Sequence, residues 1–121
     1  MKNILVMFVA VFAVSCFSPA SDDGFLLEPK LFAEKLKETP DAVLIDVRTP
    51  GEVAQGIIEG AININLQGRD FSEKMEALDK NGQYFVYCKM GGRSGAARKK
   101  MLQMGFVNVY DLKGGYNNWS R

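Results

Sequence analysis

The sequence predicts an α/β fold with a small, mainly parallel central sheet of about five strands and helices on both faces. Short apolar runs alternate with helix-like segments along the chain, as they do in βαβ units. Two of these runs, 42–45 and 84–87, are continuously apolar, which is typical of strands covered on both faces. Polar or reactive side chains follow the predicted strands, at the edge of a parallel sheet where ligands gather.

The first half of the domain supplies three of the predicted strands. Residues 25–27 form a short edge strand, and Pro29 then opens a helix over 30–37. Its apolar stripe is Leu31, Phe32 and Leu36, and Thr39-Pro40 ends it. The run 42–45 is the second strand. Thr49-Pro50-Gly51-Glu52 has the spacing of a capping box and begins a short helix, and 61–64 alternates as a small strand.

The second half adds two strands and two longer helices. A helix is expected over 70–78, with Phe71, Met75 and Leu78 on its apolar face. After a turn at Asn81-Gly82, the run 84–87 forms a buried strand that ends at Cys88. The remaining elements are a helix over 94–104 capped by Gly105, a strand over 106–110, a turn at 113–115 and a short segment at 116–119.

Composition predicts one globular domain, because the chain has 121 residues, 47% of them hydrophobic and 24% charged. The net charge of +1 gives no support for a nucleic-acid partner or broad membrane-surface binding. With no histidine and no second cysteine near Cys88, a metal site is not expected, nor is a cofactor. We expect a monomer. From Cys88 onward the chain carries seven basic residues and one acidic residue, which suits a small anionic substrate.

Residues 1–20 are predicted to be a signal peptide that precedes a domain over 21–121. Lys2 is followed by an apolar run from Ile4 to Val14, which is too short to span a bilayer. The signal peptide could be cleaved after Ala20. Alternatively, residues 1–15 are a lipoprotein signal and Cys16 is the lipidated N-terminus. The second is favoured slightly, because a cysteine directly after the apolar run is otherwise unexplained. Both alternatives predict an exported protein, periplasmic or lipid-anchored, whose one free thiol is Cys88.

Cys88 is the candidate nucleophile of the chain. It follows an apolar strand and enters a glycine-rich loop, Lys89-Met90-Gly91-Gly92-Arg93-Ser94, that leads into a helix. This layout directs backbone N–H groups and a helix N-terminus at one sulfur, which favours the thiolate. Because the chain has no histidine, the loop itself must activate the thiol. The alternative is an inert buried cysteine.

The spacing of the loop bears on its ligand. Four residues separate Cys88 from Arg93, one fewer than in tyrosine-phosphatase-type sites. The shorter loop forms a narrower cradle, which fits a single extra sulfur on the cysteine better than a phosphate group. Asp46 and Asp111 also stand at predicted strand ends, so we expect their loops to share one rim with Cys88.

Four segments in order resemble those of single-domain rhodaneses of the exported bacterial type, a family of sulfurtransferases, over residues 25–119. Leu44-Ile45-Asp46-Val47-Arg48 resembles the strand end of the family, and Glu52 to Gly56 with Gly60-Ala61-Ile62-Asn63-Ile64 resembles its second motif. The stretch from Cys88 to Ser94 resembles its active loop, and Gly105-Phe106, Val109-Tyr110 and Gly114-Gly115 through Trp119 resemble its closing segment. Ile57 and Glu59 depart from the family, which usually has histidine and proline there.

The resemblance implies a thiosulfate sulfurtransferase, an enzyme that works through a persulfide on Cys88. The donor is thiosulfate or a similar anion, and the acceptor is cyanide, a thiol or a protein. Arg93 is expected to brace the loop, with a buried carboxylate as one candidate partner, while Lys89 and Arg48 could attract the donor. Asp46 and Arg48 are more simply a structural pair that ties loops together, and Glu52 is expected to cap its own helix.

Two other functions stay open on the sequence alone. Cys88 could hold sulfur as a non-catalytic carrier or redox module for a partner protein. A phosphatase or arsenate reductase on the same fold is the third reading, which the short loop disfavours. A membrane contact is expected only through a lipid on Cys16.

Overall fold

The computed structural model describes residues 24–119, in which five parallel strands form one sheet in the order β1-β5-β4-β2-β3. This confirms the predicted α/β fold. The strands are β1 (Leu26–Leu27), β2 (Val43–Asp46), β3 (Ile62–Asn63), β4 (Gln83–Tyr87) and β5 (Asn108–Leu112). The predictions for residues 1–20 and for Cys16 lie outside the described residues. No helix within 24–119 is long and apolar enough to cross a membrane.

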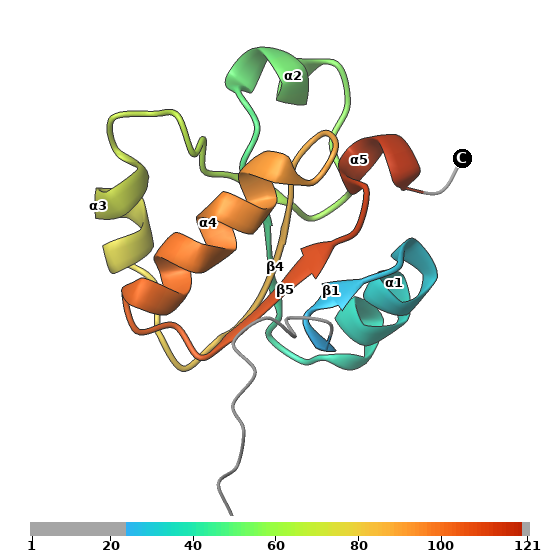
Figure 1. Ribbon diagram of the computed structural model, residues 1–121, viewed down its shortest axis with the longest axis horizontal. Coiled ribbons are helices and arrows are strands. Elements are labelled where there is room, and N and C mark those ends of the chain that lie inside the picture. The colour runs from blue at the N-terminus through green and yellow to red at the C-terminus, as the bar shows by residue number, and fades with distance from the viewer. Residues whose placement is uncertain (1–23, 120–121) are drawn as a thin grey trace, which may run out of the picture.

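Helices cover both faces of the sheet (Figure 1). They are α1 (Pro29–Glu38), α2 (Pro50–Ala54), α3 (Phe71–Glu76), α4 (Gly92–Gln103) and α5 (Gly115–Asn118). One core joins α3 and α4 to the sheet through Phe71, Met75 and Met101. The other joins α1 and α5 to the sheet through Phe32 and Tyr116. Helix α2 buries no residue and lies at the edge where β2 ends.

Strand β4 is the centre of the sheet and carries the candidate nucleophile at its end. Tyr84 and Val86 point into the core under α3 and α4, while Phe85 and Tyr87 point into the core under α1 and α5. Because side chains alternate between the two faces of a strand, a strand buried on both faces must be apolar throughout. That explains the continuous run in the sequence and why Cys88 emerges from the interior.

One core residue and the bounds of strand β5 differ from the sequence predictions, and α3 ends at Glu76, two residues earlier than predicted. Leu31 is 51% exposed. Phe32 takes the inward position on α1, and Leu31, one residue earlier, therefore points about 100° away from it around the helix. Strand β5 begins at Asn108, since the amides of Phe106 and Val107 bond to Met101 and Lys80 instead of the sheet. The strand consequently runs two residues further than predicted and contains Asp111.

Candidate active site

The loop after β4 wraps around the sulfur of Cys88, which is 1% exposed. The backbone N–H of Gly91 donates a hydrogen bond of 3.0 Å to Cys88 Sγ. Gly91 has a φ of 117°, a region that glycine adopts without strain. The turn at Gly91 brings α4 back so that it begins at Gly92, two residues earlier than predicted. Gly92 itself is helical and does not have a positive φ.

Helix α4 begins against the sulfur. The N–H groups in the first turn of an α-helix have no partner within the helix and carry partial positive charge. Cys88 Sγ lies 3.4 Å from the hydroxyl of Ser94, which in turn donates to the carbonyl of Gly91 at 3.1 Å. Of the backbone N–H groups predicted to face the sulfur, that of Gly91 donates to it, and the Ser94 hydroxyl also contacts it.

Helix α5 holds the outer side of the loop, which sequence reasoning missed. The N–H of Tyr116 donates to the carbonyl of Cys88 at 2.7 Å, and that of Asn117 donates to the carbonyl of Lys89 at 3.0 Å. These bonds turn both carbonyl oxygens toward α5. Gly115 permits this approach, because a Cβ there would lie 2.6 Å from the backbone of Cys88 and Lys89. The signal in the sequence was the pair Gly114-Gly115.

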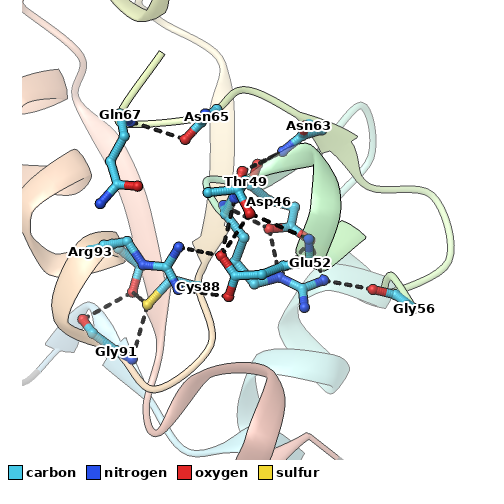
Figure 2. Close-up of polar contacts among 12 residues, drawn as sticks. Asp46, Thr49, Glu52, Gly56, Asn63, Asn65, Gln67, Cys88, Gly91 and Arg93 are labelled. Atoms are coloured by element: carbon cyan, nitrogen blue, oxygen red, sulfur yellow. Dashed lines mark hydrogen bonds and ion pairs between the residues drawn. The ribbon is translucent and has the colours of Figure 1, made fainter. Parts of the chain in front are cut away.

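Arg93 braces the loop, as expected, and its partner is Glu52. Figure 2 shows the guanidinium of Arg93 facing the carboxylate of Glu52, with two hydrogen bonds of 2.5 and 2.9 Å. Glu52 also completes the capping box with Thr49 at the start of α2. The Arg93 hydrogen bonds lower the pKa of Glu52 to about 2, and Glu52 raises that of Arg93. The alternative that this carboxylate is buried is wrong, since its side chain is 27% exposed.

Asp46 and Arg48 form the structural pair that the sequence indicated. Both are buried, and Arg48 Nη2 lies 2.6 Å from Asp46 Oδ2 and 2.7 Å from the carbonyl of Gly56. Hydrogen bonding to Asp46 raises the pKa of Arg48. The guanidinium also stacks on Tyr116, 4.4 Å from the ring centre. Arg48 therefore links the end of β2 to α5, which holds the reactive loop.

A hollow of about 180 Å³ lies beside the loop. The hollow brings Arg48 and the exposed Lys89 together, and its described lining is Arg48, Glu52, Gln55, Lys89, Tyr116 and Asn117. Met90 points away from the core and is 72% exposed. Among residues 24–119, no group of three His, Cys, Asp or Glu side chains could hold a metal ion.

Asp111 lies behind the loop, inside β5. Its side chain is buried, and burial raises its pKa to about 6 against the opposing effects of Ser94, Arg98 and the backbone of Leu112. Oxygen Oδ1 has no hydrogen-bond partner. The sequence placed Asp111 on the same rim as Cys88; in the sheet it lies opposite Val86, two residues before Cys88, and the Ser94 hydroxyl lowers its pKa.

The sequence and the fold are similar to those of a known family of proteins. The family model described as Rhodanese-like domain matches residues 28–121. A sulfurtransferase from Allochromatium vinosum is 32% identical over 95 residues, which cover 78% of this chain and 87% of that protein. A tRNA uridine(34) hydroxylase from Nitrobacter winogradskyi is 37% identical over 110 residues, 84% of this chain but 43% of the hydroxylase. The crystal structure of a rhodanese-related protein from Thermoplasma volcanium matches with a TM-score of 0.67 at 32% identity, over 78% of this chain and 88% of that one.

Proposed function

The chain belongs to the family of rhodanese-like domains, and from that premise we propose that it moves a sulfane sulfur from thiosulfate or a similar donor to a thiophilic acceptor through a persulfide on Cys88. One observation carries the proposal: the Gly91 N–H donates to Cys88 Sγ at 3.0 Å within a loop that ends in a helix N-terminus. Such a cradle stabilises an anion on the sulfur.

The reaction has two half-reactions. The Cys88 thiolate attacks the outer sulfur of thiosulfate, a new S–S bond forms, and sulfite leaves with the electron pair of the bond that breaks. An acceptor such as cyanide then attacks the outer sulfur of the persulfide, and the Cys88 thiolate leaves. The covalent intermediate predicts ping-pong kinetics. The amides around Gly91 and the first turn of α4 carry the charge of the terminal sulfur through both steps.

The charged groups divide between holding the loop and attracting the donor. Arg93 is paired to Glu52 in a two-bond contact, so we assign it to the shape of the loop. Lys89 is exposed, and Arg48 reaches the same hollow with its charge already balanced by Asp46. We therefore assign the attraction of thiosulfate and the release of sulfite mainly to Lys89.

Intact mass spectrometry after incubation with thiosulfate tests the proposal. The wild-type chain should gain the mass of one sulfur atom, and Cys88→Ser should gain none. Cyanide should then discharge the sulfur and form thiocyanate. An equal gain on Cys88→Ser, or no gain on the wild type, refutes the proposal. A persulfide that neither cyanide nor small thiols discharge indicates a carrier for a protein acceptor, and release of phosphate from an aryl phosphate indicates phosphatase chemistry.

We also propose that the protein is exported and lipidated on Cys16, from the charge and apolar pattern of residues 1–20. Palmitate labelling in a bacterial host should mark the wild type and leave Cys16→Ser unlabelled. Label on both variants, or on neither, refutes the lipid anchor, and secretion of an unlabelled chain cleaved near Ala20 favours an ordinary signal peptide.

A further inference from the structure

We propose that Asp111 and the sulfur of Cys88 share one negative charge through the hydroxyl of Ser94, so that the sulfur becomes an anion most readily when Asp111 is protonated. Asp111 is then a positioning residue that sets the charge of the reacting atom without touching the donor. The inference rests on the proposed function for its role in turnover, but the charge sharing itself is a property of the free protein.

Ser94 stands between the two groups. Its hydroxyl oxygen accepts from Cys88 Sγ at 3.4 Å and lies next to the carboxyl of Asp111, whose pKa it lowers. The hydroxyl of Ser94 has one proton to donate. Because Ser94 has no exposed surface, that proton must go to an acceptor within the protein. The acceptors around it are the carbonyl of Gly91, the sulfur of Cys88 and the carboxyl of Asp111.

Asp111 is poorly solvated for an ionised carboxylate. Its register partners, Leu26 on β1 and Val86 on β4, are apolar, and Oδ1 has no hydrogen-bond partner. A buried carboxylate with one oxygen left without a hydrogen bond is costly to ionise, which favours the protonated carboxyl. Burial raises the pKa of Asp111 to about 6, which places its titration close to neutral pH.

The charged groups around this pair are few among the described residues. Arg98 of α4 acts on Asp111 and lowers its pKa. On the sulfur side the cations are Arg93, which is balanced by Glu52, Arg48, which is balanced by Asp46, and the exposed Lys89. Lys35 of α1 packs on Tyr110, the residue before Asp111. The side chain of Tyr110 points to the opposite face of the sheet from that of Asp111, so Lys35 lies on the other face.

The proton balance follows from these contacts. When Asp111 is ionised, the Ser94 hydroxyl turns to the carboxylate and the Cys88 thiol keeps its proton. When Asp111 takes up a proton, the carboxyl can donate to Ser94 Oγ, and the Ser94 hydroxyl is released to donate to a sulfur anion. One negative charge is thus held behind the loop in either state, on the carboxylate or on the sulfur. In a persulfide on Cys88, the terminal sulfur would share the negative charge with Asp111 in the same way.

The substitution Asp111→Asn tests this arrangement, because it keeps the shape and removes the charge. The rate of Cys88 alkylation by iodoacetamide at pH 7 should rise about tenfold, as expected when a like charge on the far side of the Ser94 hydroxyl is removed. An unchanged or lower rate overturns the proposal. Alkylation requires no sulfur donor, so this result is independent of whether thiosulfate is the substrate.

Two variants serve as controls. Asp70→Asn removes an exposed carboxylate that pairs with Lys74, and it should change the alkylation rate less than twofold. In a Ser94→Ala background, the gain from Asp111→Asn should fall below about threefold, because the bridging hydroxyl is missing. An undiminished gain in that background overturns the proposal that the charge is shared through Ser94.

A measurement on folded proteins covers the case in which Asp111→Asn is unstable. The infrared band of the protonated carboxyl of Asp111 should persist to higher pH in the wild type than in Cys88→Ser, whose side chain carries no charge. Identical titrations of this band in the two proteins overturn the proposal.

Discussion

Replacing Gly115 with alanine should disable the reactive loop, although Gly115 does not touch the sulfur. A Cβ at this position would lie 2.6 Å from the carbonyl oxygen of Cys88 and equally close to the carbonyl group of Lys89. These are backbone atoms, so the overlap is relieved only if α5 and the loop move apart. That movement breaks the 2.7 and 3.0 Å hydrogen bonds from Tyr116 and Asn117 that hold the loop.

The structure sets the size of the effect. Gly115 has a φ of 64°, where alanine costs about 1–2 kcal/mol. Loss of two backbone hydrogen bonds adds about 1 kcal/mol each. The free energy of unfolding should therefore fall by about 3–4 kcal/mol, which lowers Tm by roughly 12 °C or more in a domain of this size. A loop displaced by about 1 Å should lose about a hundredfold in the rate of sulfur uptake.

Gly60→Ala is the matched control for backbone strain. Gly60 has a φ of 87°, and nothing lies within 4 Å of its Cβ position, so this variant carries the strain without the clash. Thermal unfolding and the rate of persulfide formation should be measured for both variants. If Gly115→Ala unfolds at the same temperature as Gly60→Ala and takes up sulfur within threefold of the wild-type rate, the inference that α5 shapes the loop is wrong.

Two further predictions concern the ion pairs around the site. Asp46→Asn leaves the charge of Arg48 buried and unbalanced, and urea titration should show a loss of about 3–5 kcal/mol in the free energy of unfolding; a loss under 1 kcal/mol contradicts this. Glu52→Gln removes the partner of Arg93 and should cost about 1 kcal/mol of stability while slowing persulfide formation severalfold. The pKa of Glu52 is lowered to about 2, so its contribution is full above its ordinary value of 4.5 and is lost as the pH falls through about 2. Equal acid sensitivity of the wild type and Glu52→Gln between these values would contradict it.

Features with local causes were predictable from the sequence. The apolar run of β4, the capping box of Thr49 and Glu52, and the glycine-rich loop after Cys88 depend on residues within one turn or one strand of each other. Side-chain alternation, capping geometry and the backbone freedom of glycine act over that range. The fold class and the candidate nucleophile followed from these patterns and from their order along the chain.

Contacts between distant segments were settled by the tertiary structure. Arg93 pairs with a residue 41 positions away, and the sequence gives no means of choosing Glu52 from its thirteen acidic residues between 21 and 87. The hydrogen bonds from α5 to the loop and the placement of Asp111 behind Ser94 depend on β2 and β5 flanking β4 in the sheet. The sequence alone determined that Cys88 is the candidate nucleophile. The order of the strands decided which groups lie around its loop, because it brings segments that are distant in the sequence side by side.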